Sequence, residues 1–558
     1  MTDGDGRKRF SPSRESNLPS SATRRQASPG SFFSASPARG PPTRRCLAIR
    51  IRLQALEPAR LFLLASLLFG LPLLFLTPPF QVPDEPAHFL RAYAISQGRL
   101  LPERAAEGVG SELPLSLLRL IELTMAEVTF QPDQRFAPRV LAEAMTIELE
   151  PAQHAFATYP TSAVYSALPY LPQALGILFG RAVSDRPLVL LYCGRSSNFV
   201  AATALIAIAL AQLPALRSFV CVVALCPMAM YLRASISPDA IALAMAASTA
   251  ALVARMTFAT PIEQSRRRRG WLLVAATALC LTKLPYAPLA LAAAMVPSSR
   301  VRASSARRSG ALETPEAASP FGADRGSPGK SLSSRSMASS RATDSASGRT
   351  TWRRSLPRPD RFAVTAVVLL AGTTTLSLLL ALRVGSLDID DRVDPGVQVA
   401  NAMEHPWSFA RMVVSDWVVH APRYAAELIR RLGWLDTPLP LAFLAAFAAA
   451  LVFLAVADGR GGVAVPLPRR VVLGGLLLAS AGLISAAQYA SWTPVGADRV
   501  LGIQGRYFLP LMPFAGFVCV SQRASARAGQ WTSRVAWLAV AASGVVTLVV
   551  LAARFWVG

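Results

Sequence analysis

The sequence predicts an all-α, polytopic membrane protein, and three observations lead to that prediction. Hydrophobic residues make up 52% of the 558 residues and charged residues only 16%, whereas soluble proteins average about 25% charged residues. Apolar runs of roughly 20 residues, long enough to cross a bilayer, recur along the chain. Basic residues gather in segments that flank these runs, so the net charge of +24 indicates membrane topology rather than a nucleic-acid partner.

Nine apolar runs are long enough to be membrane crossings. They lie at about 60–77, 190–212, 217–233, 238–257, 361–383, 437–457, 471–490, 506–521 and 534–556. Another apolar stretch, 270–297, is broken by Lys283 and Pro285, so we expect two short helices that form a hairpin. Together these segments predict about 11 transmembrane helices. The stretch 161–181 is apolar but holds two prolines, and it either crosses or lies at the interface.

The segments between the runs predict the orientation. Residues 1–58 and 298–360 are basic and rich in Ser, Pro, Gly and Ala, so we expect a disordered cytoplasmic tail and a disordered cytoplasmic linker. Residues 78–160 hold 11 acidic residues and 6 Arg. Residues 384–436 hold 8 acidic residues and 5 Arg. Both segments are therefore expected on the extracytoplasmic side.

These segments divide the chain into two transmembrane halves, 59–297 and 361–558. The number of crossings agrees with the charges only if 161–181 does not cross, because the four arginines 266–269 must stay inside. We therefore expect a multi-pass protein of the inner (plasma) membrane with a cytoplasmic N-terminus.

Ionisable residues beside membrane segments are candidates for function because burying a charge in lipid is costly. Asp84 and Glu85 follow the first run. Paired carboxylates there suit a general base and its partner. His88 is four residues after Asp84 and would share its helix face. The alternative is that Asp84 and Glu85 only cap the start of a helix.

Three further charged residues raise the same question. Arg506, in Gln504-Gly505-Arg506-Tyr507-Phe508, either holds a phosphate or snorkels to the interface. Lys283, at the break of the apolar hairpin, is a second phosphate ligand or another snorkelling cation. Asp239, in Ser237-Pro238-Asp239, is a second catalytic carboxylate or a helix cap.

The histidines suggest a metal site as a further alternative. All four histidines fall in the predicted outer segments, but no HxxxH or HxH spacing accompanies them. We therefore expect no metal or other cofactor, a divalent ion being the alternative.

Five segments in this order resemble the bacterial predicted membrane proteins of the domain-of-unknown-function family numbered 2142. They are PPFQVPDEPAHFLRAYAISQGRL (78–100), ASISPDA (234–240), LTKLPYAPL (281–289), LGWLDTPLP (432–440) and GIQGRYFLP (502–510). That family is placed near the GT-C glycosyltransferases, which take a sugar from a polyprenyl-phosphate donor outside the membrane.

The resemblance implies a GT-C-like fold and an inverting transfer from a polyprenyl-phosphate sugar to a glycan or lipid of the cell envelope. The loop 78–160 would be catalytic, and the partners would be the lipid-linked donor, membrane lipid and the acceptor, without nucleic acid. By this resemblance Asp84, Glu85 and Asp239 would be catalytic, and Lys283 would bind the donor. To these matches we add Arg506, Arg91 and Tyr507 as candidate donor-binding residues and His88, Gln504 and Arg195 as supporting residues. The alternative for Arg195 is a hydrogen bond to a neighbouring helix.

A second function stays open at this point. The protein could be a transporter or an assembly factor for lipid-linked surface polysaccharide, without catalysis. A transporter places its polar residues near the bilayer midplane, whereas the candidates here gather at the outer edge. The sequence therefore favours the enzyme.

Overall fold

The computed structural model describes residues 57–126, 128–258, 265–296, 361–384, 392–459 and 463–557. The expected disordered linker, 298–360, lies outside these described residues. So does the expected disordered tail, 1–58, apart from its last two residues. The described part is mostly helical, as the composition predicts.

Six helical segments in the described ranges are long and apolar enough to cross a membrane, and each coincides with a predicted run. The first, Pro58–Leu76, consists of α2 (Pro58–Ala65), η1 (Ser66–Gly70) and α3 (Leu71–Leu76). The next four are α9 (Pro187–Gln212), α12 (Pro238–Phe258), α16 (Arg361–Val384) and α20 (Leu467–Trp492). The sixth, Gln522–Phe555, consists of α22 (Gln522–Ala528), η7 (Gly529–Trp531) and α23 (Thr532–Phe555). Several helices of this length and composition in one chain are the pattern expected of a multi-pass membrane protein.

The other three predicted runs are helical but shorter or interrupted. They form α10 (Arg217–Ala224) with α11 (Pro227–Arg233), α19 (Leu441–Ala457), and η6 (Gly505–Leu511) with α21 (Met512–Cys519). Proline explains two of the interruptions, at Pro227 and Pro510, because it lacks the N–H that would continue an α-helix. The total of about 11 crossings therefore stays a prediction.

The predicted hairpin has its break at the expected residue. Helix α13 (Arg266–Thr282) ends at Lys283, whose backbone is extended. The chain then continues through η4 (Leu284–Tyr286), α14 (Ala287–Ala290) and η5 (Leu291–Met295).

The first predicted outer segment forms a folded subdomain, which adds a small sheet to the predicted helices. It contains α4 (Glu85–Ser96), α5 (Leu115–Met125), α6 (Pro138–Ala144) and an antiparallel sheet in the order β1 (Glu103–Ala105), β2 (Gly108–Pro114), β3 (His154–Thr158). Pairing aligns Gly110 with Thr158. A side chain at Gly110 would overlap the backbone of Ala157. The two glycines of β2 lower its strand propensity, and its partner β3 is distant in sequence, so local patterns do not reveal the sheet.

The stretch 161–181 forms α7 (Pro160–Ala163), η2 (Leu168–Tyr170) and α8 (Leu171–Val183). Helix α8 has 13 residues and is about 20 Å long, too short to cross a hydrocarbon core of about 30 Å alone. It packs along α9 instead.

The second predicted outer segment and the residues that follow it hold α17 (Pro395–Glu404), α18 (Pro406–Ile429) and the short pair β4 (Arg431–Leu432) and β5 (Thr437–Pro438). Trp434, between the two strands, donates its indole N–H to the carbonyl of Phe80 at 3.1 Å. This bond joins the two outer segments at the turn that follows the first membrane helix.

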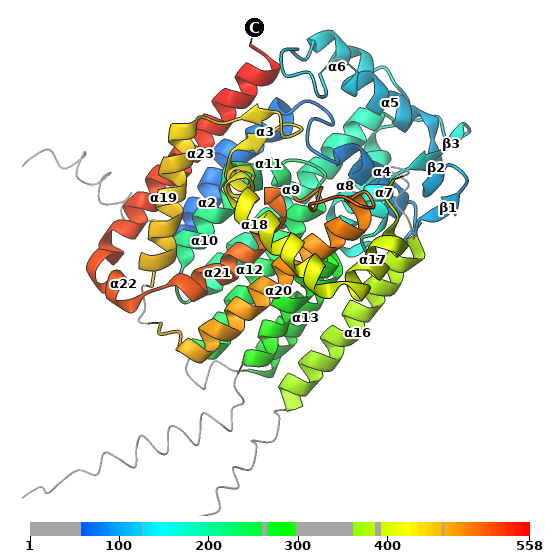
Figure 1. The fold of residues 1–558 in the computed structure, drawn as a ribbon. Helices are drawn as coiled ribbons and strands as arrows, with labels where there is room; N and C mark the ends of the chain where they lie inside the picture. Colours follow the sequence, from blue (N-terminus) through cyan, green and yellow to red (C-terminus); the bar gives the residue numbers. More distant parts are fainter. Residues whose placement is uncertain are drawn as a thin grey trace, which may run out of the picture. The chain divides into compact units, whose positions relative to one another are not determined.

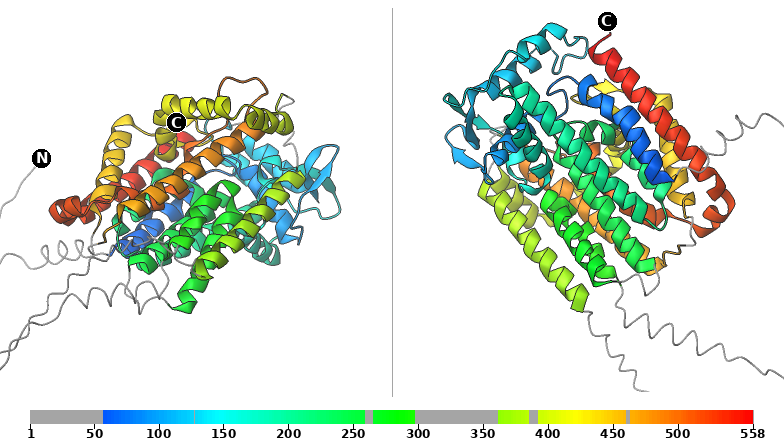
Figure 2. Two further views of the ribbon diagram at one scale, coloured as in Figure 1. Left: turned by 60° about the horizontal axis from the view of Figure 1, so that its bottom comes forward. Right: turned by 180° about the vertical axis from the view of Figure 1, so that it is seen from behind.

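Helices from both halves of the sequence pack together. Helix α12 contacts η6, α10 contacts α23, and α14 contacts α20. Helix α12 is central, because 83% of its apolar 18-residue stretch is buried. In α16 only 11% of the corresponding stretch is buried. Helix α16 runs along α13 at the edge of the assembly (Figures 1 and 2). Its exposed leucines, among them Leu379 and Leu382, suit contact with lipid.

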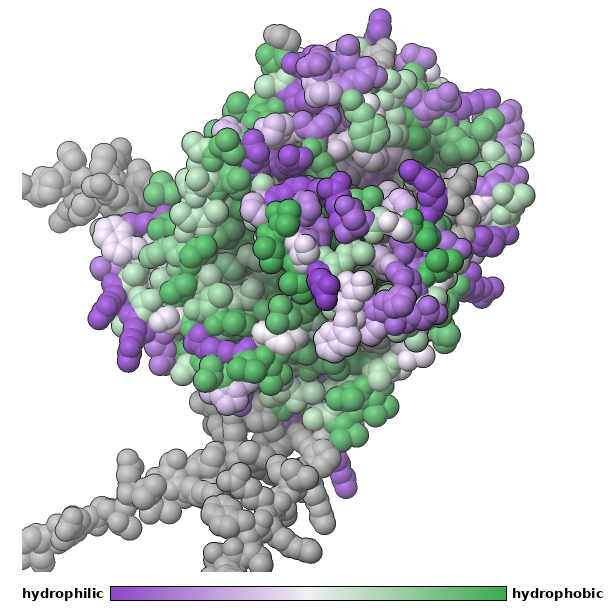
Figure 3. Space-filling model, viewed as in Figure 1, coloured by the Kyte–Doolittle hydropathy of each residue, from purple (hydrophilic) through white to green (hydrophobic). Residues whose placement is uncertain are grey.

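The surface of the described helices is apolar over much of the face shown in Figure 3. In the view of Figure 3, hydrophobic side chains cover much of the lower half, whereas hydrophilic side chains gather at the top, over α5 and α6. A hydrophilic subdomain next to a largely apolar helical surface is the distribution expected of a membrane protein.

The orientation can be tested by cysteine labelling. In a variant whose native cysteines are replaced by serine, Asp133→Cys in the first outer segment should react with an impermeant maleimide in intact cells. Lys330→Cys, in the basic linker, should react only after permeabilisation, because positive loops stay inside. Labelling of position 330 in intact cells would reverse the predicted orientation.

Candidate functional site

The turn after the first membrane helix presents Asp84. This residue occupies the N-cap position of α4 with a left-handed backbone (φ 63°), and its side chain makes no capping bond. Its carboxylate is ion-paired with Arg506 instead. A non-glycine residue in this conformation is strained, and such strain gathers at functional sites. The capping alternative for Asp84 therefore holds for its position but not for its side chain.

Glu85 turns away from Asp84 into the protein and pairs with Arg195 of α9. The pair is bidentate, with Arg195 Nε and Nη2 donating to Glu85 Oε1 and Oε2 at 2.8 and 2.6 Å. Both side chains are fully buried. The same guanidinium donates to the carbonyls of Leu74, Thr77 and Pro78 at 2.8–3.0 Å. This pair therefore fixes the turn that presents Asp84.

Asp239 and Lys283 form a second buried ion pair. Asp239 lies in the first turn of α12, and its carboxylate contacts the ammonium of Lys283. The ammonium also lies 4.9 Å from the ring centroids of Tyr165 and Tyr507. Two aromatic faces and a carboxylate stabilise a cation away from water. Lys283 is 8% exposed, so it does not snorkel.

Arg506 joins the two acidic residues. It is 2% exposed, pairs with Asp84, and its Nη1 donates to the carbonyl of Pro83 at 3.2 Å. Its Nε lies 3.8 Å from Asp239 Oδ2 and has no hydrogen-bond acceptor among the described residues. Its burial excludes the snorkelling alternative. Asp84, Arg506, Asp239 and Lys283 thus form a row of alternating charges from four distant segments, which we call the charge row.

The segment that carries Arg506 is held against α18. Glu427 Oε2 accepts from the backbone N–H of Gly505 at 3.0 Å, and a side chain at Gly505 would overlap the α18 backbone. This close approach explains the glycine of the Gln-Gly-Arg-Tyr-Phe motif. Tyr286 also donates its hydroxyl to the carbonyl of Tyr507 at 3.1 Å.

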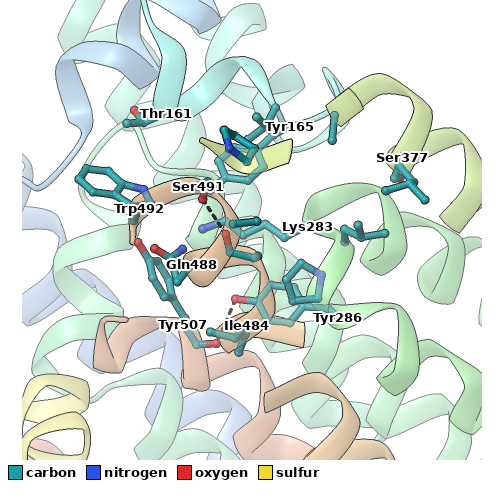
Figure 4. Close-up of a pocket in the computed structure, with 18 of the residues that line it drawn as sticks. Thr161, Tyr165, Lys283, Tyr286, Ser377, Ile484, Gln488, Ser491, Trp492 and Tyr507 are labelled. Atoms are coloured by element: carbon teal, nitrogen blue, oxygen red, sulfur yellow. Dashed lines mark hydrogen bonds between the residues drawn. The ribbon is translucent and has the colours of Figure 1, made fainter. Parts of the chain in front are cut away.

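A cavity of about 990 Å³ opens beside the charge row, and we call it the first cavity. Figure 4 shows Lys283 between Tyr165 and Tyr507, facing the same space as Gln488, Ser491 and Trp492 of α20. The last turns of α16 and α20 form apolar walls, with Leu378, Ala381, Leu382, Ile484 and Ala487. The cavity therefore joins a charged end to the apolar surfaces of two membrane-length helices.

Comparison with known sequences establishes the family. The profile of the family described as predicted membrane protein, DUF2142, matches residues 67–515. The chain belongs to the DUF2142 family. Comparison with curated proteins found no match, and neither did comparison with solved structures.

Three of the five DUF2142 segments that carried the resemblance, 78–100, 281–289 and 502–510, supply residues that line the first cavity. Five predicted site residues line it: Asp84, His88, Lys283, Arg506 and Tyr507. Asp239 does not line the cavity itself but pairs with Lys283, which does. Glu85 and Arg195 are buried behind it.

Two other predicted residues have different surroundings. Gln504 precedes η6, and its backbone carbonyl accepts from the N–H of Tyr507. Arg91 lines a second cavity, which also borders Tyr165 and Ser166. Its predicted contact with the donor phosphate is thus not supported by its position.

Sequence reasoning missed three groups at this DUF2142 site. Tyr165 supplies one of the two rings beside Lys283, and Ser166 donates to the carbonyl of Leu281 at 2.6 Å. Ser377, Gln488 and Ser491 line the cavity from α16 and α20. A polar residue in the last turns of an apolar run was the available signal for this last group.

Electrostatics differ between the two titratable groups of α4. Burial is the largest single effect on the pKa of Asp84 and raises it, but the neighbouring charges and the hydrogen bond from Arg506, with the Arg506 charge foremost, together outweigh burial and hold that pKa below its usual value. Burial lowers the pKa of His88 to about 4, although Asp84 and Asp239 oppose this effect. His88 is therefore neutral at pH 7, and Tyr170 contacts its Nδ1 at 2.9 Å. Within the described ranges, no three His, Cys, Asp or Glu side chains converge as a metal site would need.

The lowered pKa of His88 predicts an acid-sensitive fold. Protonation costs free energy in the folded state, so stability is complete above pH 6.5 and falls toward pH 4. The loss amounts to about 3 kcal/mol at pH 4. We expect the melting temperature of the detergent-solubilised protein to fall across this window, and to fall less in His88→Gln. Identical pH profiles for the two proteins would contradict the burial of a neutral histidine.

Proposed function

We propose that this DUF2142 protein is a membrane glycosyltransferase of GT-C type that uses a polyprenyl-phosphate sugar and acts on the extracytoplasmic side of the inner membrane. One observation carries the proposal. The first cavity combines two cations and two carboxylates with apolar walls from the membrane-length helices α16 and α20. A phosphate attached to an isoprenoid chain is the ligand class that matches both ends.

The donor phosphate is assigned to Lys283 and Arg506. In the charge row these two cations balance Asp84 and Asp239, so the row itself is neutral before a ligand binds, and Asp394 is a further carboxylate on the cavity lining. Arg506 Nε still lacks an acceptor among the described residues, which suits a phosphate oxygen. A phosphate there competes with Asp84 for the same guanidinium. Donor binding would therefore release Asp84 from Arg506 and strengthen it as a base.

The isoprenoid chain is assigned to the apolar walls. Helix α16 is mostly exposed along its length, and its last turns line the cavity. The chain can therefore pass from the cavity along α16 into lipid without meeting a charged helix face. This arrangement needs no nucleotide-binding fold.

The proposed reaction is a displacement at the anomeric carbon with inversion. The acceptor hydroxyl oxygen forms a bond to that carbon, and the bond from the carbon to the phosphate oxygen breaks. The hydroxyl proton passes to Asp84, and polyprenyl phosphate leaves with the bonding electron pair. Lys283 and Arg506 stabilise the charge that grows on the leaving phosphate. Asp239 holds Lys283 in place, and Glu85 holds the turn that carries Asp84.

Donor binding tests the phosphate assignment. The probes are farnesyl phosphate and farnesol, titrated into the purified full-length protein in phosphatidylcholine nanodiscs. We expect the double variant Lys283→Ala, Arg506→Ala to bind farnesyl phosphate at least about tenfold more weakly, because charge-assisted hydrogen bonds are lost. Each single variant should retain part of the affinity, and the two effects should not add fully if both residues contact one phosphate.

Two controls sharpen this test. Farnesol lacks the phosphate, so it should bind wild type and double variant equally. Arg217→Ala removes a partly exposed arginine that pairs with Glu57 and lines none of the cavities described, so it should leave both ligands unaffected. Unchanged farnesyl phosphate binding in the double variant would reject the phosphate site and favour the transporter or assembly function.

A further inference from the structure

The strongest unexplained side chain outside the charge row is Arg91 of α4. It is 1% exposed, and Nη2 donates to the carbonyl of Leu100 at 2.7 Å. Nε and Nη1 have no acceptor among the described residues. Its guanidinium carbon lies 5.9 Å from the ring centroid of Tyr159, which gives weak support on one side. A buried guanidinium with two unsatisfied nitrogens is costly unless a ligand supplies the acceptors.

Arg91 lines a cavity of about 550 Å³ between the β1–β2 hairpin and the last turn of α16, and we call it the second cavity. Arg104 and Arg383 also line it, with Glu103 as the one acidic residue among the lining residues described. Three arginines against one glutamate give this cavity an excess of positive charge. The neutral charge row of the first cavity differs from it in this respect.

We propose that the second cavity binds an oxyanion, a phosphate or a carboxylate, carried by the acceptor, with Arg91 as its main ligand. The planar guanidinium presents adjacent N–H donors that match two oxygens of such a group. Arg104 and Arg383 add attraction at the rim of the cavity. This inference rests on the proposed function only in naming the ligand an acceptor; the anion site itself does not depend on it.

The position of the second cavity supports an acceptor rather than a second donor. Tyr165 and Ser166 line both cavities, so the two spaces adjoin at this segment. An acceptor whose anionic group lies against Arg91 can extend past Tyr165 and bring a hydroxyl toward Asp84. The substrate class is thus an envelope glycan or lipid that carries a phosphate or carboxylate near the hydroxyl that is glycosylated.

The test uses inorganic phosphate as the probe. It is titrated into full-length protein in phosphatidylcholine nanodiscs, in the Lys283→Ala, Arg506→Ala background, so that the first cavity does not contribute. We expect Arg91→Gln to weaken phosphate binding at least about tenfold and Arg383→Gln, an exposed position, to weaken it severalfold. Arg119→Gln, an exposed arginine of the same outer segment, is the matched control and should change nothing.

Two further measurements make the result decisive. Arg91→Gln alone should bind farnesyl phosphate like wild type, which shows that it folds and that the two cavities act separately. In the second measurement, part of the phosphatidylcholine is replaced by phosphatidic acid or, for comparison, by phosphatidylglycerol at equal charge. Displacement of bound phosphate by phosphatidic acid assigns the anion to a lipid headgroup. If phosphate stays bound, the anion belongs to a soluble molecule.

Phosphate binding that is unchanged by both Arg91→Gln and Arg383→Gln, or that is absent from the background protein, would overturn the proposal. A failure of farnesyl phosphate to bind wild type would reject the donor site alone.

Discussion

Asp84→Asn should lower the rate of sugar transfer by about 10²–10⁴-fold, the usual loss when a general base is removed. Asparagine keeps the size of the side chain and an oxygen that can accept from Arg506, but it cannot take the acceptor proton. The left-handed backbone at position 84 also tolerates asparagine, so the turn should survive. Farnesyl phosphate should still bind, because the carboxylate does not hold the phosphate and a neutral amide competes for Arg506 less strongly than a carboxylate does.

This prediction is measured in cells that lack the gene and carry a plasmid copy, with surface glycans analysed by mass spectrometry. Asp133→Asn is the matched control, since Asp133 is an exposed carboxylate of the same outer segment. Wild-type glycan output from Asp84→Asn would reject the base assignment. Because His88 is neutral and lines the same cavity, His88→Gln in the Asp84→Asn background would then identify the alternative base.

Breaking the Glu85–Arg195 pair should destabilise the protein by about 3–5 kcal/mol, because removing one partner leaves an uncompensated buried charge. Arg195→Ala removes two bonds to Glu85 and three to backbone carbonyls at the end of the first helix. Glu85→Ala leaves the guanidinium buried without its carboxylate. Both single variants should show a lower melting temperature in detergent and a lower yield of monodisperse protein.

The Arg119–Glu150 pair provides the comparison. Its side chains are 50% and 38% exposed, so Arg119→Ala should cost at most about 1 kcal/mol. The double variant Glu85→Gln, Arg195→Met removes both charges and should recover part of the lost stability. If Glu85→Ala melts like wild type but transfers no sugar, Glu85 acts in catalysis rather than in positioning.

Long apolar runs could be predicted from the sequence, because a segment that crosses a bilayer needs about 20 mostly apolar residues, and this is a property of the local sequence. Six of them appear as membrane-length helices, and Lys283 stands at the predicted break. The sheet of the first outer segment was not predictable, since β2 is rich in glycine and its partner β3 is 40 residues further along the chain. The number of crossings depends on how proline-broken segments lie in lipid, which helix length does not decide.

The candidate residues of the site could be named from the sequence because charges beside apolar runs are costly and thus conspicuous. Their roles could not be separated. Asp84 and Glu85 are adjacent in sequence, yet one faces the first cavity and the other a buried arginine, because the left-handed turn at Asp84 directs their side chains apart. Local sequence does not encode which distant cation each carboxylate will meet. Only tertiary packing brings Arg506 and Lys283 to the first cavity and places Arg91 in the second.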